Sequence, residues 1–307
     1  MRPLSGSMQH AGARTQLWGT CPPGPMPTKL NQPGKSRSTR TKGGGKTNAM
    51  LHQHFVRTAR WGLANGHAPK QDLILSGAGR RGAGMATCHV YIADLLSFPA
   101  AAWQSLSPVE QARASRFLQE DDRCRFALGR HVARHLAAVV AGVDPADVVI
   151  QLSCLDCGAT SHGKPRAVCG AGVIPVSISH SGQKVLVAAT NGAEVGADIE
   201  QVDAARFDPA LFGQIASPTE AAQLRPDAWT FYRLWTLKEA ALKCTGDGLM
   251  LAPQGFTIDL SVDPPRLRSG TGRLAGPIAL RPLDVETGYM AALALATPAD
   301  IQIVRVG

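Results

Sequence analysis

Residues 196–203 read GADIEQVD, and they place two carboxylates, Asp198 and Glu200, two positions apart in a segment with the pattern of a β-strand. Successive side chains of a strand point to opposite faces, so Asp198 and Glu200 share one face and Ile199 points away from it. Two unpaired carboxylates side by side repel each other and raise each other's pKa. We therefore expect a cation between them, and a hard divalent ion is the natural candidate.

A second stretch, residues 235–248, reads WTLKEAALKCTGDG and has the pattern of a helix. Trp235, Glu239 and Lys243 follow at intervals of four and form one stripe, with Lys238 beside it. Glu239 would complete a site of three carboxylates for Mg²⁺, which prefers oxygen ligands and keeps room for waters and substrate phosphates. The alternative interpretation is a solvated edge strand and a surface ion pair worth about 0.3 kcal/mol.

Two shorter stretches carry groups suited to phosphate. Residues 177–182, SISHSG, place Ser179, His180 and Ser181 at the end of a predicted strand, where a hydroxyl and an imidazole can reach a phosphate. Residues 162–167, HGKPRA, place Lys164 between Gly163 and Pro165 in a predicted loop. Such a loop would hold the Lys164 ammonium in a fixed position facing a phosphate. Each of these signals is weak by itself, because a single histidine is more often a packed or surface residue.

Taken together and in this order, these stretches resemble the 4'-phosphopantetheinyl transferase superfamily, specifically the single-chain type that activates surfactin synthetase and similar assembly lines. The resemblance spans residues 86–300, and it is supported by SRFLQEDDRCRFALGR at 115–130 and GYMAALALA at 288–296. One departure is Ala197, where the family usually carries a bulkier Ile or Val between the glycine and the aspartate. The first 85 residues have no counterpart in the family.

The resemblance implies an α+β fold, a pseudo-dimer of two similar halves with coenzyme A in the cleft between them. It also implies a reaction in which a serine of an apo acyl or peptidyl carrier protein attacks the β-phosphorus of coenzyme A, with Mg²⁺ bound. The products would be the holo-carrier protein and adenosine 3',5'-bisphosphate.

The resemblance further implies a role for each matched residue. Asp198, Glu200 and Glu239 would hold Mg²⁺, Lys243 would stabilise the leaving pyrophosphate, and Glu239 would act as general base, with or without a water between. Lys164 and His180 would grip the phosphates on the adenosine side. The residues expected to contact coenzyme A are Lys164, Ser179, His180, Lys238, Lys243 and Arg116. Arg125 and Arg130 either join them or belong to a solvated helix face.

The net charge of +9 is concentrated at the amino-terminal end of the chain. Residues 1–85 hold 13 of the 32 Lys and Arg residues and one acidic residue, Asp72, whereas residues 86–307 hold 19 basic and 22 acidic residues. We predict a disordered basic tail over 1–85, because Gly, Pro, Ser and Thr dominate it and apolar periodicity is lacking. This tail has three interpretations. It is a transit peptide, a basic arm that touches nucleic acid or membrane, or an over-extended start with Met85 as the natural first residue.

Seven cysteines, an odd number, are scattered along a chain that has no export signal at its start. We expect reduced thiols. Cys154, Cys157, His162 and Cys169 have ligand types that zinc prefers, at spacings near those of a small knuckle. A loop whose cysteines are spaced by chance is the other interpretation, and the sequence leaves both open.

The segment after Met85 alternates predicted strands and helices. We expect a strand over 88–94, two helices between 107 and 142 that part near LQEDD, a hairpin over 173–191 and a helix over 228–245. Ser107 with Glu110 and Ser217 with Glu220 have capping-box spacing. We place a boundary between an amino-terminal half, 86–192, and a carboxy-terminal half, 193–307, that carries the metal site.

Two rival functions fit parts of the pattern. A Mg²⁺-dependent phosphodiesterase or nuclease would also use three carboxylates and lysines, but residues 86–307 are slightly acidic, which disfavours nucleic acid as partner. A non-catalytic coenzyme A-binding protein is the second rival. The chain has no run of 18 apolar residues, so we expect a cytoplasmic protein that does not bind a membrane. The slightly acidic charge of residues 86–307 predicts that nucleic acid is not a partner, and the family resemblance implies a monomer. The carrier protein served and the use of acylated coenzyme A stay open.

Overall fold

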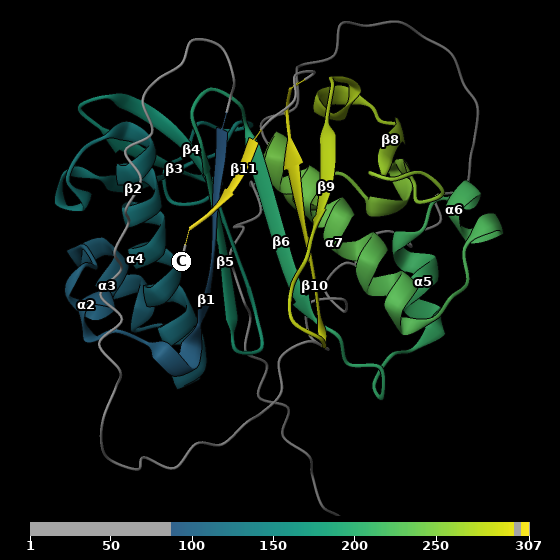
Figure 1. The fold of residues 1–307 in the computed structure, drawn as a ribbon, viewed down its shortest axis with the longest axis horizontal. Helices are drawn as coiled ribbons and strands as arrows, with labels where there is room; N and C mark the ends of the chain where they lie inside the picture. The colour runs from purple at the N-terminus through teal and green to yellow at the C-terminus, as the bar shows by residue number, and fades with distance from the viewer. Residues whose placement is uncertain (1–86, 298–301, 307) are drawn as a thin grey trace, which may run out of the picture.

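A computed structural model describes residues 87–297 and 302–306, and the expected tail over 1–85, with Met85, lies outside the described residues. The architecture is α+β, with two sheets and a long helix on each (Figure 1). The six-stranded sheet has the order β11-β1-β5-β4-β3-β2 and the five-stranded sheet the order β6-β10-β9-β8-β7.

The strands divide between the two sheets at the end of β5 and the start of β6, and of the described strands only β11 returns to the first sheet. The first sheet contains β1 (Thr87–Asp94), β2 (Val149–Ser153), β3 (Lys164–Cys169), β4 (Gly172–Ser181), β5 (Lys184–Thr190) and β11 (Gln302–Arg305). The second contains β6 (Val195–Gln201), β7 (Thr257–Asp259), β8 (Arg266–Ser269), β9 (Ala279–Leu283) and β10 (Tyr289–Leu295). The α-helices are α2 (Ala100–Gln104), α3 (Pro108–Ala114), α4 (Glu120–Ala141), α5 (Pro209–Ile215), α6 (Pro218–Gln223) and α7 (Ala228–Thr245).

Helix starts and stops follow from their capping residues. Ser107 and Glu110 form a complete capping box at α3, and Ser217 and Glu220 form one at α6, as their spacing predicted. Helix α7 ends at Gly246, which has φ of 79° and lies in the left-handed region that glycine adopts without strain. The two helices predicted between 107 and 142 are therefore α3 and α4.

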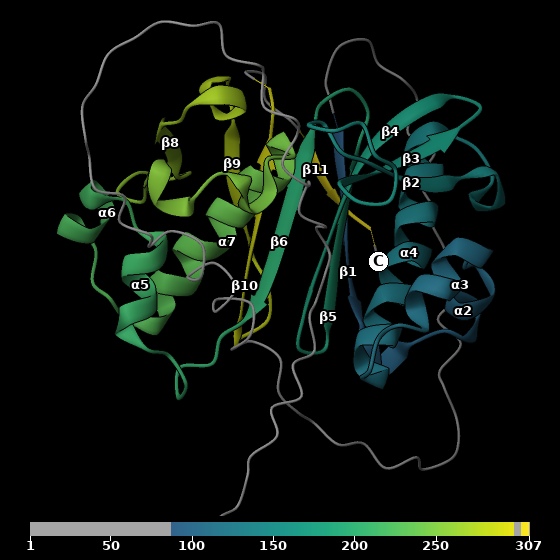
Figure 2. The ribbon, with the colours of Figure 1, turned by 180° about the vertical axis from the view of Figure 1, so that it is seen from behind.

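Of the four apolar cores among the described residues, three stack the sheets and the long helices into layers. Helix α4 packs on the outer face of the first sheet, where Leu136 of α4 and Val187 of β5 belong to one core. Helix α7 packs on the second sheet, where Leu237 of α7 and Ala294 of β10 belong to another. Between the sheets, Leu186 of β5 and Ile199 of β6 belong to a third core with residues of β1 and β10. Burying each leucine or isoleucine contributes about 1.5–3 kcal/mol, which fixes the order α4, first sheet, second sheet, α7 (Figure 2).

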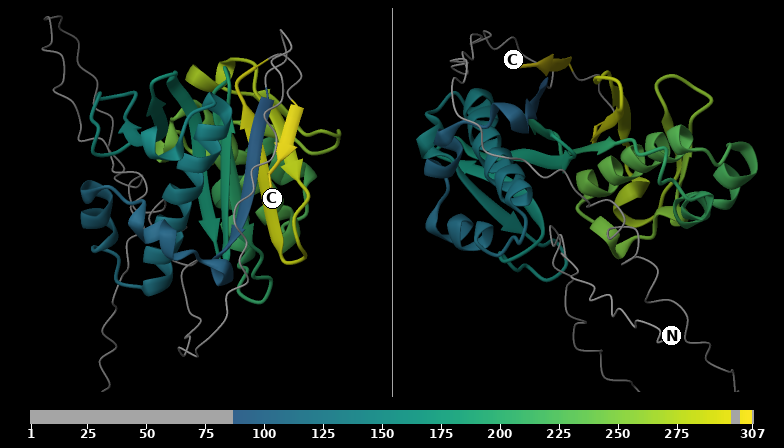
Figure 3. Two further views of the ribbon diagram at one scale, coloured as in Figure 1. Left: turned by 60° about the vertical axis from the view of Figure 1, so that its left-hand side comes forward. Right: turned by 90° about the horizontal axis from the view of Figure 1, so that it is seen from below.

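The last strand, β11, returns across the boundary that we expected at 192/193. It pairs in parallel with β1, where Thr87 faces Gln302 and Val90 faces Arg305. Figure 3 shows the two strands side by side at the edge of the first sheet. The carboxy-terminal strand therefore contributes to the same sheet as the amino-terminal strand.

Lys164 is placed differently from our prediction. We expected it in a loop, but it is the first residue of β3 and faces Ser153 of β2 in an antiparallel pair. The neighbouring Pro165 does not interrupt the pairing with β4, because the partners on that side begin at Arg166. β2, β3 and the short strand β8 were not predicted as strands.

Candidate active site

The carboxylates Asp198 and Glu200 lie on β6, at the edge of the second sheet, and face helix α7. Ile199 points the other way into the core between the sheets, as the alternation of a strand requires. Gly196 shares the face of the two carboxylates, and a Cβ built there would lie 1.9 Å from the Ala240 carbonyl oxygen. Glycine at 196 therefore allows α7 to approach β6 closely enough to place its own charged stripe over the carboxylates.

The stripe on α7 meets the carboxylates as its spacing predicted. Lys243 Nζ donates to Asp198 Oδ1 at 2.6 Å, and Trp235 Nε1 donates to Glu200 Oε1 at 3.2 Å. Glu239 lies between these two contacts along the helix, and its electrostatic partners are Lys243 and Asp198. Helix α7 thus presents one cation, one carboxylate and one indole N–H to the two carboxylates of β6.

Three serines of β4 fasten the two sheets together along β6. The hydroxyls of Ser177, Ser179 and Ser181 accept hydrogen bonds from the backbone N–H groups of Ala197, Ile199 and Gln201, at 2.9, 3.4 and 3.1 Å respectively. These hydroxyls satisfy N–H groups that the edge strand would otherwise leave unpaired. The alternating serines of SISHS therefore connect the two sheets and also form part of the site.

Two of these serines also donate to the carboxylates. Ser179 Oγ donates to Asp198 Oδ1 at 2.7 Å, and Ser181 Oγ donates to Glu200 Oε2 at 2.8 Å. Lys243 Nζ donates to Ser179 Oγ at 3.0 Å, so Ser179 connects all three elements. Sequence analysis considered Ser179 and Ser181 for contacts to a phosphate but did not consider Ser177, and their contacts to β6 depend on which strand lies opposite.

The electrostatics of this cluster come from burial of several charges together. Asp198 is 2% exposed, Glu239 8% and Lys243 9%. Burial, followed by the Asp198 charge, raises the pKa of Glu200 to about 8. Burial raises the pKa of Glu239 to about 7 even though the Lys243 ammonium acts to lower it. For Lys243, burial acts to lower the pKa, but Asp198 and Glu239 outweigh it and the pKa is raised.

His180 and Arg116 lie outside the carboxylate cluster. His180 is half-buried on β4 between two of the bridging serines, and burial, followed by the Arg125 charge, lowers its pKa to about 4. Arg116 is exposed in the turn between α3 and α4. Arg125 donates to the Gly182 carbonyl oxygen and to Asp122, both at 2.7 Å, so its guanidinium already holds the turn after β4.

The structure does not bring Lys164 and Lys238 into the carboxylate cluster. Lys164 is 2% exposed and donates to Glu194 at 2.6 Å and to the Cys244 carbonyl oxygen at 2.7 Å. Lys238 is fully buried on another side of α7 and donates to Glu220 at 2.6 Å and to three carbonyl oxygens. Both ammonium groups are engaged by the protein, which does not support our expectation that they contact coenzyme A phosphates.

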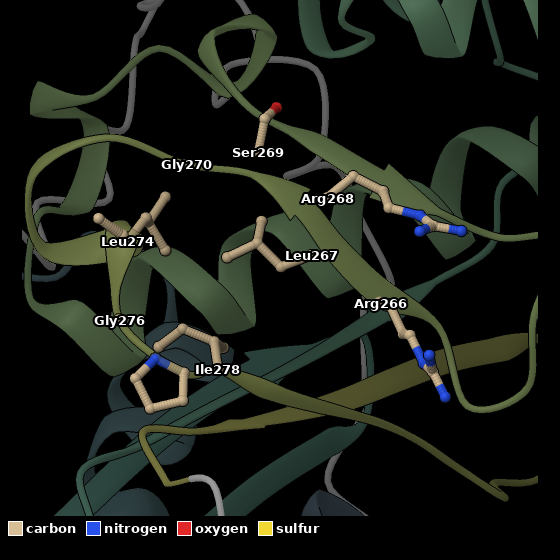
Figure 4. A pocket seen from close by; sticks show the side chains of 10 residues that line it. Arg266, Leu267, Arg268, Ser269, Gly270, Leu274, Gly276 and Ile278 are labelled. Carbon is tan, nitrogen blue, oxygen red and sulfur yellow. The ribbon is translucent and has the colours of Figure 1, made fainter.

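A cavity of about 460 Å³ lies elsewhere, on β8 and the segment leading into β9 (Figure 4). It is lined by Arg266, Arg268 and Leu274 among others, and β8 is three strands away from β6 in the second sheet. None of the residues predicted for the site lines this cavity. The candidate site is therefore the buried polar cluster formed by β4, β6 and α7.

Comparison with known proteins shows the family to which this chain belongs. The family model of the 4'-phosphopantetheinyl transferase superfamily matches residues 194–294, which include β6, α7 and β10. A 4'-phosphopantetheinyl transferase of Bacillus subtilis is 32% identical over 164 residues, covering 52% of this chain and 68% of that protein. The chain belongs to the 4'-phosphopantetheinyl transferase superfamily. It is an enzyme that transfers phosphopantetheine to carrier proteins.

Two further relatives support the assignment of this phosphopantetheinyl transferase. The transferase HetI of a Nostoc species is 33% identical over 153 residues, covering 47% of this chain and 61% of that protein. The transferase Sfp of Bacillus subtilis strain 168 is 27% identical over 210 residues, covering 63% of this chain and 83% of that protein. These similarities favour the transferase over the nuclease and the non-catalytic binding protein considered from the sequence.

Proposed function

We propose that this transferase takes phosphopantetheine from coenzyme A in a Mg²⁺-dependent reaction, with Asp198, Glu200 and Glu239 as the metal ligands. The observation that carries the proposal is a pair of buried carboxylate oxygens, Asp198 Oδ2 and Glu239 Oε1, which have no hydrogen-bond partner among the described residues. Burying an unsatisfied carboxylate oxygen is costly, and a bound cation removes that cost. Oxygen donors from two elements match the preference of Mg²⁺.

In this proposal, a Mg²⁺ ion held by Asp198, Glu200 and Glu239 would neutralise negative charge on the pyrophosphate of coenzyme A. The ammonium of Lys243 adds a second positive charge, held in place by Asp198 and Ser179, next to the leaving group. The serine oxygen of the carrier protein forms a bond to the β-phosphorus while the bond to the bridging oxygen breaks. Holo-carrier protein and adenosine 3',5'-bisphosphate are the products.

We propose Glu239 as the group that accepts the serine proton. Burial raises the pKa of Glu239 in the metal-free protein to about 7, whereas Mg²⁺ bound at Glu239 would lower it, so the assignment rests on the position of Glu239 beside Lys243. Glu239 lies on the same stripe as Lys243, and because Oε1 is the oxygen proposed for the ion, Oε2 is the oxygen left to accept the proton, directly or through a water. The proton acceptor and the leaving-group cation are then one helical turn apart on the same rigid element.

We further propose that the two helix-on-sheet units are the halves of a pseudo-dimer, with coenzyme A in the cleft between them. His180 and Ser179 on β4, together with the exposed Arg116, are then the proposed contacts to its phosphates. Lys164 and Lys238 act as buried supports of α7 rather than as ligands.

The enzyme is proposed to act as a cytoplasmic monomer on a carrier of fatty acid, polyketide or nonribosomal peptide synthesis. Within the described residues no helix combines the length and apolar character needed to cross a bilayer.

The metal assignment is tested by titrating Mn²⁺, a spectroscopic substitute for Mg²⁺, into the complex of the protein with coenzyme A. We expect one tight site, with affinity reduced about tenfold or more in Asp198→Asn and in Glu239→Gln. Asp203→Asn, which changes an exposed acid just beyond β6, is the matched control and should bind as the wild type does. Unchanged Mn²⁺ affinity in both site variants would contradict the ligand set.

A further inference from the structure

A second group of metal-binding side chains lies in the loop between β2 and β3, outside the active site. One ligand atom from each of Cys154, Cys157 and His162 lies within 4.8 Å of the others. Among the residues that the structure describes, this is the one set of three His, Cys, Asp or Glu side chains that meets this distance. The proposed transfer reaction uses none of the three.

The backbone of the loop folds tightly around the first cysteine. Cys154 N–H donates to the Ala159 carbonyl oxygen at 2.9 Å, and Gly158 N–H donates back to the Cys154 carbonyl oxygen at 3.0 Å. The backbone N–H groups of Cys157 and Asp156 interact with the Cys154 sulfur. Such N–H···S contacts favour the thiolate, which is the form of cysteine that binds metal ions.

His162 completes the group from the other end of the loop. Its Nε2 lies 3.3 Å from Cys157 Sγ, and its Nδ1 lies 3.4 Å from Ser161 Oγ. A metal-binding histidine usually has a hydrogen-bond partner on the ring nitrogen that does not face the metal, and Ser161 occupies that position. Cys169 does not join the group, because it ends β3 and its thiol donates to the Gly172 carbonyl oxygen at 3.7 Å.

We propose that Cys154, Cys157 and His162 bind one zinc ion, with a water molecule as the fourth ligand. Two thiolates and an imidazole are a ligand set that zinc prefers, and it accepts them in tetrahedral geometry. Cys154 is buried and Cys157 is exposed, so the group has an inner side held by the protein and an outer side open to solvent for the water. This zinc site is independent of the proposed carboxylate site for Mg²⁺.

The position of the loop indicates what the zinc ion would do. Arg273 donates to Asp156 in the loop at 2.7 Å and to Asp247, just after α7, at 2.9 Å. Leu155 packs over Gly246, where a Cβ would lie 2.9 Å from its Cδ1. The loop then leads into Lys164, whose ammonium binds the last turn of α7 at the Cys244 carbonyl oxygen. Zinc would therefore fasten the loop that covers the carboxy-terminal end of the helix bearing Lys243.

The test is the zinc content of the full chain, purified under reducing conditions after equilibration with zinc, measured by mass spectrometry of the element. We expect about one zinc ion per chain. Cys157→Ser should lose it, whereas Cys169→Ser, which removes a thiol outside the group, should keep it. Asp198→Ala should also keep it, because the carboxylates are a separate site. Circular dichroism would verify that each variant is folded.

Cobalt in place of zinc gives a second readout. Wild-type protein and Cys169→Ser should show the intense visible bands of tetrahedral cobalt with thiolate ligands, and Cys157→Ser should not. Zinc-free wild-type protein after equilibration, or equal zinc in Cys157→Ser and the wild type, would overturn the proposal. A disulfide between Cys154 and Cys157 that forms even in the presence of zinc would overturn it in favour of redox chemistry.

Discussion

The ammonium of Lys243 lies 2.6 Å from Asp198 Oδ1, so a cation from α7 neutralises a carboxylate of β6 before any ligand binds. Both groups are almost completely buried. Removing one partner of a buried ion pair leaves the other charge uncompensated and costs about 3–5 kcal/mol. The stability of the site and its chemistry therefore depend on the same contact.

Lys243→Met should lower the melting temperature strongly in Mg²⁺-free buffer, because Asp198 loses its cation. Added Mg²⁺ should restore part of that loss, since a divalent ion supplies the missing positive charge and binds only the folded state. Thermal unfolding with and without Mg²⁺ measures both effects. Lys184→Met, which removes a cation paired with Asp94 and Glu286, is the control and should show no such rescue. Equal stabilisation of the two variants by Mg²⁺ would argue against a metal at Asp198.

Gly196→Ala should disrupt the contact between β6 and α7. The added Cβ would lie 1.9 Å from the Ala240 carbonyl oxygen and 2.4 Å from the Cys244 nitrogen, so backbone atoms must move. We expect a loss of about 1–3 kcal/mol in the free energy of unfolding, together with reduced transfer activity. Gly213→Ala in α5, where nothing lies within 4 Å of the new Cβ, is the matched control. Denaturant unfolding of both variants decides, and equal stabilities would refute the close-approach explanation.

Glu239→Gln should abolish most turnover while the variant still folds. A general base contributes about 10²–10⁴-fold to a rate, so we expect a loss of kcat in that range. Single-turnover transfer from coenzyme A at saturating Mg²⁺ measures the chemical step separately from metal binding. Glu194→Gln, which changes a carboxylate outside the cluster, should keep far more activity. Full activity in Glu239→Gln would remove Glu239 from the role of base.

The pair of Glu194 with Lys164 predicts an acid dependence of stability. Burial acts to raise the pKa of Glu194, but Lys164 and Arg166 outweigh it and the pKa lies below its ordinary value of 4.5. A carboxyl whose pKa is lowered in the folded state contributes stability above its unfolded pKa and loses it as the pH falls through the folded one.

Glu194→Gln should therefore be less stable than the wild type at pH 7, and the difference should shrink as the pH falls below 4.5. Unfolding by denaturant across this pH range measures the difference directly. Asp203→Asn, at an exposed ion pair, should show little difference at any pH. A difference in the free energy of unfolding between Glu194→Gln and the wild type that is constant with pH would contradict a lowered pKa of Glu194 in the folded state.

The local features of the fold could be predicted because short-range rules determine them. Capping boxes at Ser107 and Ser217, the stop at Gly246 and the alternation around Ile199 depend on neighbouring residues alone. Trp235 and Lys243 share one face of the helix, and Asp198 and Glu200 share one face of the strand, so the contacts between these residues agree with the predicted spacing.

The long-range partners could not be predicted. Nothing near Lys238 in the sequence shows that Glu220 and three backbone carbonyl oxygens enclose it, and nothing near Lys164 points to Glu194. The matched motifs therefore predict phosphate contacts for these lysines, whereas the contacts of both ammonium groups in the structure are to protein oxygens. The same limit applies to Ser177 and Ser181, whose role in connecting the two sheets depends on which strand lies opposite.

The central claim is tested most directly by incubating the protein with coenzyme A, Mg²⁺ and a panel of apo carrier proteins, and measuring the intact mass of each carrier. We predict a gain of one phosphopantetheine group on at least one carrier, lost with a chelator that removes Mg²⁺ and in Asp198→Ala. The same gain in Asp198→Ala or without a divalent ion would contradict the proposed carboxylate site. An absence of gain on every carrier, with wild-type protein, Mg²⁺ and coenzyme A present, would contradict the account as a whole.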